Sequence, residues 1–475
     1  MRDAAGLAMQ AQTMLRQGRV EDAIAFYRSA LSIQPNRADD WFNLGWALRQ
    51  KRAFEDALQA YAKAIEYGVR GPHEARLNRA VILVEDLNRP ADAERELEAA
   101  LASNPKFTAA LLNLGNLQED RGDRDAAAQC YGKALGADPT NSLALARLAD
   151  VSRFDDPADP LIQQLALRLD DADLTLADRA DIGFALGRAL DQAGEYGGAF
   201  KAYAKANDAS ARNRGRAYDR AASERLVTDI IAAFPEAAPT SSAKPAPIFI
   251  CGMFRSGSTL AERILARHSS ITAGGELPYI PELAASAEVR FPAGLKAISE
   301  EDFQRLRAEY ERRAASLGLG LAGLTDKRPD NFLYVGFIKQ LFPGAKIVNT
   351  VRNEADNRLS IYFAHLGPQL SYATQLDDIE HWMGCYRRLM DHWRKLYPDD
   401  IVDFDYDALV HDPEDSIRAL LLSLELSWEP VCLEPHLATN AVRTASAWQV
   451  RDPLHAGSSG RWQNYARHVA TTNSA

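Results

Sequence analysis

The sequence predicts an all-α helical-repeat array followed by an α/β domain built on a parallel sheet. The same residue types recur at intervals of 34, 36 and 34 positions in the first part of the chain. After residue 247, strand-like apolar runs alternate with helical patterns. A proline-rich segment, 235–247, separates the two patterns and has the composition of a linker. We therefore expect the repeat array over residues 1–215, a helical connector with the linker over 216–246, and the α/β domain over 247–475.

Composition and charge exclude several classes of protein. The chain has 475 residues, a formal net charge of −10 and four cysteines that lie far apart. An acidic chain has no general attraction for nucleic acid or anionic lipid, so we expect no nucleic-acid partner and a local site for any anionic ligand. No apolar run is long enough for a transmembrane helix, and the first residues lack the apolar core of a signal peptide. With no paired cysteines, these features predict a cytoplasmic protein without structural zinc.

The repeats share a fixed internal spacing. Each contains a turn residue, a small residue five positions later and a large residue nine positions later, and three of the four end in proline. Alanine allows two helices to pack closely, and proline ends the second helix of each pair. The pattern resembles the tetratricopeptide repeat, and a degenerate fifth unit around Gly194 and Tyr203 brings the array to five or six repeats. The aligned turn, large and proline positions are Gly18, Arg52, Asn88 and Gly122; Tyr27, Tyr61, Leu97 and Tyr131; and Pro35, Pro105 and Pro139.

Two roles are open for this array. Stacked helical repeats often form a concave groove that binds a peptide or a partner protein. The array could equally be a rigid spacer or the surface through which the chain forms a homodimer. The sequence favours neither role.

A glycine-containing loop opens the α/β domain. Residues 252–259 fit G-x-x-x-x-G-x-[ST], and they lie between an apolar run, 248–251, and a helical pattern over 259–267. Backbone amides and the helix N-terminus of such a loop can surround an anion. A kinase or ATPase would have lysine where this chain has Ser258, and a second strand, 346–351, is followed by Arg352 rather than by an acidic residue. The loop therefore predicts an anion site that lacks the residues for magnesium triphosphate.

The loop resembles the 5′-phosphosulfate loop of sulfotransferases that use 3′-phosphoadenosine 5′-phosphosulfate (PAPS). Arg352 and Ser360 resemble the second motif of that family, which binds the 3′-phosphate. Residues 457–464 resemble its G-x-x-G-x-W-x-N segment, and Tyr406 resembles the tyrosine beside the adenine. The resemblance extends from about Pro247 to the C-terminus. It implies PAPS as co-substrate and, as the residues that bind it, Arg255, Ser256, Gly257, Ser258, Thr259, Arg352, Ser360, Tyr406 and Arg461.

Three further segments resemble the protein-tyrosine sulfotransferase branch. Glu276 lies 21 residues after Arg255, where that branch has its catalytic glutamate, and Lys327 lies in a segment similar to its Asn-Lys-Asp-Pro. Residues 446–450 resemble its Ser-Thr-Asp-Gln-Val. This chain lacks that branch's membrane anchor and disulfides, so with its repeats it looks more like the bacterial tetratricopeptide-repeat sulfotransferases. The resemblance implies Glu276 as general base, stabilisation of the sulfuryl group by Arg255, Lys327 and Ser446, and no metal requirement.

The expected reaction is transfer of a sulfuryl group from PAPS to a hydroxyl of a protein tyrosine, a carbohydrate or a small molecule. The alternatives are a P-loop kinase or NTPase, and a non-catalytic repeat scaffold with a decayed sulfotransferase domain. Individual residues also have structural alternatives: Glu276 as a solvated loop acid, Lys327 as a surface ion-pair partner, and Arg352 as the partner of Asp356. Tyr406 could belong to the core, and His268 and His436 are alternative bases outside any matching motif.

Overall fold

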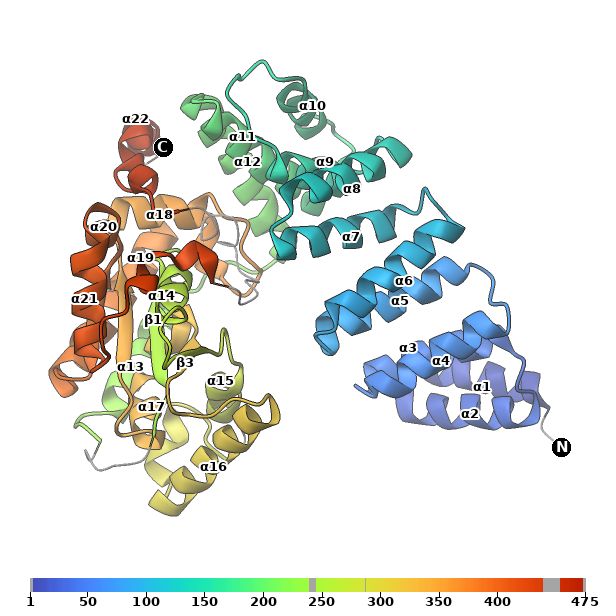
Figure 1. The fold of residues 1–475 in the computed structure, drawn as a ribbon, viewed down its shortest axis with the longest axis horizontal. Coiled ribbons are helices and arrows are strands. Elements are labelled where there is room, and N and C mark those ends of the chain that lie inside the picture. The colour runs from blue at the N-terminus through green and yellow to red at the C-terminus, as the bar shows by residue number, and fades with distance from the viewer. Residues whose placement is uncertain (1–2, 239–244, 287, 439–452, 473–475) are drawn as a thin grey trace. The chain divides into compact units, whose positions relative to one another are not determined.

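The computed structural model describes residues 3–238, 245–286, 288–438 and 453–472 (Figure 1). The chain forms two compact units, Met1–Arg153 and Phe154–Ala475. No helix among the described residues combines the length and apolar character that crossing a bilayer requires.

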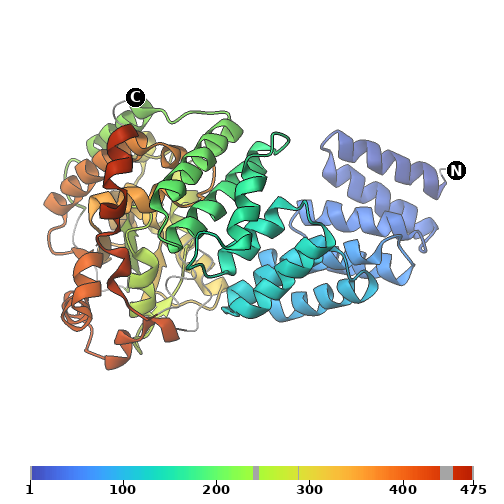
Figure 2. The ribbon, with the colours of Figure 1, turned by 90° about the horizontal axis from the view of Figure 1, so that it is seen from above.

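The first unit consists of antiparallel helix pairs stacked one after another (Figures 1 and 2). This arrangement confirms the predicted helical-repeat array for residues 4–151. The helices are α1 (Ala4–Arg16), α2 (Val20–Ile33), α3 (Ala38–Gln50), α4 (Phe54–Glu66), α5 (Pro72–Val81), α6 (Pro90–Ser103), α7 (Thr108–Arg121), α8 (Arg124–Ala137) and α9 (Ser142–Val151), with a π-helical turn, η1 (Ile82–Asp86), after α5.

The recurring small and large residues form the core of this unit. Tyr61 and Tyr131 are fully buried, and so are the alanines that precede them, Ala57 and Ala127. A Cβ atom at Gly115 would lie 2.3 Å from Cε1 of Tyr131. The tyrosine ring of the second helix therefore packs directly against the backbone of the first helix, which explains why the repeat needs a small residue there.

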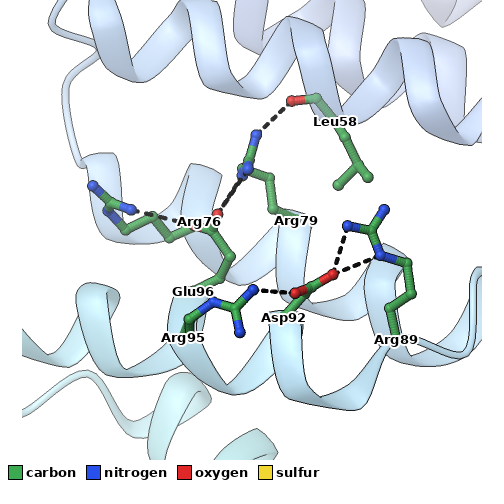
Figure 3. A network of polar contacts seen from close by, with 7 residues as sticks. All are labelled: Leu58, Arg76, Arg79, Arg89, Asp92, Arg95 and Glu96. Atoms are coloured by element: carbon green, nitrogen blue, oxygen red, sulfur yellow. Dashed lines mark hydrogen bonds and ion pairs between the residues drawn. The ribbon is translucent and has the colours of Figure 1, made fainter.

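The interval of 36 residues comes from two extra residues between Ala64 and Leu77, where the chain passes from α4 to α5. Polar contacts join the two helices of the third repeat: Glu96 of α6 accepts hydrogen bonds from Arg79 and Arg76 of α5 at 2.9 and 3.2 Å. Arg79 also donates to the Leu58 carbonyl of α4 at 2.7 Å, which links this repeat to the one before it (Figure 3). Asp92 of α6 likewise accepts hydrogen bonds from Arg89 and Arg95.

The second unit contains the predicted parallel sheet. Its strands lie in the order β2-β3-β1-β4-β5, and every neighbouring pair is parallel. Phe249 at the centre of the sheet is in register with Asp326 on one side and Ile347 on the other. The strands are β1 (Ile248–Gly252), β2 (Thr272–Ala273), β3 (Leu324–Lys327), β4 (Ile347–Val351) and β5 (Ile401–Asp405).

Helices cover both faces of this sheet. Phe249 and Ile347 belong to one core with α16, α17 and α19, whereas Ile250 and Val348 belong to another with α14 and α21. This alternation is expected because successive strand residues point to opposite faces. The helices of this domain are α14 (Ser258–Leu265), α15 (Tyr279–Ala285), α16 (Glu300–Ser316), α17 (Val335–Leu341), α18 (Glu354–Tyr362), α19 (Leu376–Leu396), α20 (Tyr406–His411), α21 (Pro413–Ser423) and α22 (Ala466–Thr472).

The helices before the linker differ from the predicted domain division. The sequence assigns residues up to 215 to the repeat array, but α10 (Pro160–Leu169), α11 (Leu176–Gln192), α12 (Tyr196–Arg214) and α13 (Arg220–Ala233) belong to the second compact unit. Tyr203 of α12 and Ile230 of α13 lie in the same core as Phe249. The reason is packing: the apolar faces of α11, α12 and α13 are buried in the core that they share with the α/β domain.

This shared core predicts where the chain can be divided. A fragment of residues 154–475 should fold and unfold cooperatively, because it keeps the whole core. A fragment of residues 245–475 should be insoluble or lack a cooperative transition, because it exposes residues such as Phe363 and Trp393 that pack against α12 and α13. Thermal unfolding followed by circular dichroism compares the two fragments. Equal cooperativity of both would contradict the shared core.

Asp326 is a buried carboxyl group in the centre of the second unit. It lies on β3 and is fully buried, and the Tyr310 hydroxyl donates to its Oδ2 at 2.8 Å. Its Oδ1 has no hydrogen-bond partner among the described residues. Burial raises the pKa of Asp326 to about 7, so the folded chain holds a proton that the unfolded chain loses at lower pH.

The raised pKa predicts a pH dependence of stability. The contribution of Asp326 is fully present below pH about 4, declines as the unfolded chain loses its proton, and is lost as the pH rises through about 7. Asp326→Asn keeps an acceptor for Tyr310 but does not titrate. The free energy of unfolding of this variant should therefore depend less steeply on pH between 4 and 7, by about 1 kcal/mol per pH unit.

Urea unfolding at several pH values measures this difference. Asp391→Asn is the matched control, because the side chain of Asp391 is 66% exposed and pairs only with Arg394 among the described residues. If Asp326→Asn kept the pH profile of the unmodified chain, the buried carboxyl would not be the titrating group.

Candidate active site

Five of the predicted site residues lie at one edge of the sheet. Arg255 follows β1, Glu276 follows β2, Lys327 ends β3, Arg352 follows β4 and Tyr406 follows β5. Because all strands are parallel, their carboxyl ends share this edge, which is where open α/β sheets bind their ligands.

The loop after β1 packs closely against β4. Gly252 has a φ of 145°, and a Cβ atom there would lie 2.5 Å from the Thr350 carbonyl oxygen. The Ser256 hydroxyl donates to the Met253 carbonyl at 2.6 Å and lies 2.7 Å from the Thr350 hydroxyl. The side chain of Ser256 therefore stabilises the conformation of the loop and holds it against β4.

Helix α14 begins directly after this loop. Gly257 precedes the helix with a φ of 106° and provides no side-chain cap. The first amides of a helix have no partner within the helix, so the start of a helix is suited to an anion. A Cβ atom at Gly257 would lie 3.1 Å from the Tyr406 ring, which borders the same helix start. Ser258 and Thr259 lie in the first turn and are buried.

Arg255 lies at the tip of the loop in a left-handed conformation, with a φ of 67°. Its Nε donates to the Ser360 hydroxyl on α18 at 3.3 Å, so the two predicted nucleotide-binding motifs meet there. Burial lowers the pKa of Arg255 to about 10, and the positive charges of Arg352, Arg461 and Arg188 lower it further. A buried cation among other cations indicates a site for an anion.

Arg352 is held between the loop and the C-terminal segment. Its guanidinium donates to the Arg255 carbonyl at 3.1 Å and to the Ser458 carbonyl, and it lies 4.8 Å from the centre of the Tyr406 ring. Its Nε is buried and has no hydrogen-bond partner among the described residues. Burial lowers the pKa of Arg352 as well. An unpartnered, buried donor on a cation is suited to an anionic ligand.

Asp356 is not the ion-pair partner of Arg352. Its two carboxylate oxygens accept hydrogen bonds from the backbone amides of Gly460 at 2.6 Å and Trp462 at 2.7 Å. The carboxylate thus fixes the C-terminal segment beside the loop, while no ion pair of Arg352 occurs among the described residues.

Glu276 and Lys327 form an ion pair at the β3 side of this edge. Lys327 Nζ donates to Glu276 Oε1 at 2.6 Å. The lysine side chain is 2% exposed and the glutamate side chain is 40% exposed. Lys327 is therefore not a surface ion-pair residue, and the carboxylate is on the accessible side of the pair.

Glu262 supports the loop that carries Glu276. This buried residue of α14 accepts hydrogen bonds from the Gly275 amide at 3.0 Å and the Thr325 hydroxyl at 2.8 Å. Burial raises the pKa of Glu262, and the charge of Lys327 opposes that rise. The sequence analysis did not identify Glu262, although it lies seven residues after Arg255 on the helix that follows the loop.

The remaining candidates do not join this group. Ser446 lies outside the described residues. Both ring nitrogens of His268 are engaged, with the Ser427 carbonyl at 2.9 Å and the Ser270 amide at 3.1 Å. His436 lies beside Arg263, which donates to its carbonyl at 3.1 Å. The described part of the chain contains no group of three or more His, Cys, Asp or Glu side chains arranged to hold a metal ion.

Arg461 contacts a residue that the sequence analysis did not identify. Its guanidinium pairs with Asp191 of α11 at 2.5 Å. Arg188, one turn earlier on the same helix, is among the cations that lower the pKa of Arg255. No local motif marks Arg188 or Asp191, because both lie in the helices that resemble degenerate repeats.

Comparisons with known proteins match the two parts of the chain to different families. Residues 247–430 match the sulfotransferase family, and residues 8–75 and 78–142 match the tetratricopeptide repeat. An uncharacterized protein of Aquifex aeolicus is 29% identical over 440 residues, which are 89% of this chain and 57% of that protein. Protein-tyrosine sulfotransferase 2 of Gallus gallus is 25% identical over 206 residues, which are 39% of this chain and 53% of that protein.

The chain thus spans somewhat more than half the length of each of these relatives. Among solved structures, YrrB, a tetratricopeptide-repeat protein with an unusual peptide-binding site, is 20% identical with a TM-score of 0.29, over 42% of this chain and 91% of that one. The family matches, the helical pairs and the five-stranded parallel sheet agree with one another. This chain therefore carries tetratricopeptide repeats followed by a domain of the sulfotransferase family.

Proposed function

We propose that this chain transfers a sulfuryl group from PAPS to the hydroxyl group of an acceptor. The observation that carries the proposal is the buried pair of cations, Arg255 and Arg352, beside the anion loop at the sheet edge that also holds Glu276 and Lys327. The cations are suited to the phosphates of the donor, and the ion pair is suited to the reaction centre.

The residues present fit the donor nucleotide. The unpartnered Nε of Arg352 and the Ser360 hydroxyl would serve the 3′-phosphate, and the start of α14 with Arg255 would serve the 5′-phosphosulfate. PAPS supplies the sulfuryl group as an activated mixed anhydride. Tyr406, which lies under Arg352 and against Gly257, would border the adenine.

Glu276 would take the proton of the acceptor hydroxyl. Its carboxylate pairs with Lys327, and its greater exposure gives an acceptor access to it. Lys327 would stabilise negative charge that develops at the bridging oxygen, as a fixed cation in a site shielded from water.

Two alternative functions differ from this one in the residues they need or in the behaviour they predict. A kinase or NTPase needs a lysine where this chain has the buried Ser258. A non-catalytic scaffold would bind nucleotide without turnover. Calorimetry with adenosine 3′,5′-bisphosphate, and with ATP and magnesium, distinguishes nucleotide classes, and binding only of ATP would reject the sulfotransferase proposal.

Transfer of labelled sulfate from PAPS to tyrosine peptides, polysaccharides and small phenols tests the activity. We propose in addition that the first unit recruits a macromolecular acceptor. In that case the fragment 154–475 should lose activity toward the large acceptor only, through a higher KM. Equal loss on large and small acceptors would reject recruitment, and no transfer to any acceptor class would favour the scaffold.

Arg352→Ala should weaken binding of adenosine 3′,5′-bisphosphate by about 2–5 kcal/mol, because it leaves a desolvated phosphate without its cation. Binding of adenosine 5′-monophosphate should change much less. Calorimetry measures both affinities. Arg387→Ala is the matched control, because Arg387 is 49% exposed and pairs with Glu354 on the surface. Undiminished preference for the bisphosphate would show that Arg352 does not bind the 3′-phosphate.

Glu276→Gln should lower kcat by a factor of about 10² or more while nucleotide affinity stays nearly unchanged. The amide keeps an acceptor for Lys327 but cannot take a proton, so the variant isolates the base. Single-turnover transfer of labelled sulfate measures the rate. Glu282→Gln is the control, because Glu282 is 56% exposed and pairs with Arg313. Turnover near that of the unmodified chain would assign the base elsewhere.

A further inference from the structure

A carboxylate from the degenerate repeats reaches the C-terminal segment of the sulfotransferase domain. Asp191, near the end of α11, accepts from Arg461 Nη2 at 2.5 Å and Nε at 3.3 Å, and it also accepts from the Tyr465 hydroxyl. Its side chain is 13% exposed. A two-pronged contact of this kind fixes the plane of a guanidinium group.

The hairpin of α11 and α12 is docked rigidly on the elements that carry the nucleotide motifs. Tyr203 stacks on Phe363 with ring centres 4.1 Å apart. Asn207 donates to the Tyr362 carbonyl at 2.8 Å and is 2% exposed. Tyr362 ends α18, the helix of Ser360, so the hairpin is packed within two residues of the predicted 3′-phosphate motif.

The C-terminal segment is fixed to the same motif from the other side. Arg352 donates to the Ser458 carbonyl, and Asp356 accepts from the amides of Gly460 and Trp462. The Arg461 backbone is therefore positioned by α18 and its side chain by α11. Asp191 holds one edge of the Arg461 guanidinium, which lies 5.5 Å from the centre of the Phe363 ring, and the charge of Arg461 acts on Arg255.

We propose that the α11–α12 hairpin forms one wall of the nucleotide site. Asp191 acts as a positioning residue that orients Arg461 as a further cation beside Arg255 and Arg352. The ligand class is a nucleoside with a 3′-phosphate dianion. This inference rests on the proposed function and extends it to helices outside the sulfotransferase-family match.

Whether removing the Asp191 charge strengthens or weakens nucleotide binding distinguishes two roles for this residue. Removing a negative charge near a phosphate tightens binding by Coulomb's law when the carboxylate does nothing else. Losing a contact that orients Arg461 weakens binding, by about tenfold or more for a hydrogen bond between charged groups. We expect Asp191→Asn to weaken binding of adenosine 3′,5′-bisphosphate by about tenfold, with a smaller effect on adenosine 5′-monophosphate. Asp191→Glu should restore part of the loss.

Calorimetry on the full chain with both nucleotides tests this, with thermal unfolding midpoints measured in parallel. The matched control is Asp208→Asn, because Asp208 is exposed and pairs with Arg212 on α12. In the background of Arg461→Ala, Asp191→Asn should cause little further loss, because its effect passes through Arg461.

Tighter or unchanged bisphosphate binding in Asp191→Asn, with or without a lower unfolding midpoint, would overturn the positioning role. If the unmodified chain failed to prefer the bisphosphate, the proposed function would fail and this inference with it. A preference that survives all variants would reject the inference alone.

Discussion

The site depends on the burial of one cation, Arg255, beside other guanidinium groups. Its backbone has a φ of 67°, a conformation that a non-glycine residue adopts only where its surroundings impose it. The contacts of Gly252 with β4 and of Ser256 within the loop impose that conformation before any ligand binds. The loop is thus organised in advance, and its unfavourable concentration of positive charge is the part that an anion would relieve.

The nearby carboxylates form bonds with the chain itself. Asp356 accepts from two backbone amides, Asp407 accepts from the Ser459 hydroxyl and the Asn353 amide, and Asp191 holds Arg461 and Tyr465. These contacts tie the C-terminal segment to α18, to α20 and to α11. The charges of Asp356 and Asp407 also favour the charged form of Arg352, against the burial that lowers its pKa. The acidic groups therefore hold the segments around the site together and offset part of its positive charge.

The sequence predicted the parts of the site that follow from local pattern. A strand, a glycine-containing turn and a helix are recognisable in consecutive residues, and so Arg255 and Arg352 could be placed at strand ends. Strand β2 has two residues and β3 has four, too few for an alternating pattern to be visible. The helical hairpin could not be assigned, because Gly187 against Tyr203 is the same small-to-large contact whether the outer face of the pair stacks on another repeat or on a sheet domain. The contact of Asp191 with Arg461 can be recognised only once that packing is known.

Lys327 is a buried lysine whose ion-pair partner, Glu276, is exposed. If Glu276 turns to the acceptor to receive its proton, Lys327 loses its only bonded carboxylate among the described residues, and an uncompensated buried ammonium is costly. Glu262 is a second acidic group near Lys327: it accepts hydrogen bonds from the Thr325 hydroxyl and the Gly275 amide, burial raises its pKa, and the charge of Lys327 opposes that rise. Neither of these two bonds involves the Glu276 side chain, so Glu262 keeps its place when that side chain moves. This buried residue thus holds the loop that carries Glu276 and lies near the ammonium group that the ion pair would leave without a bonded carboxylate.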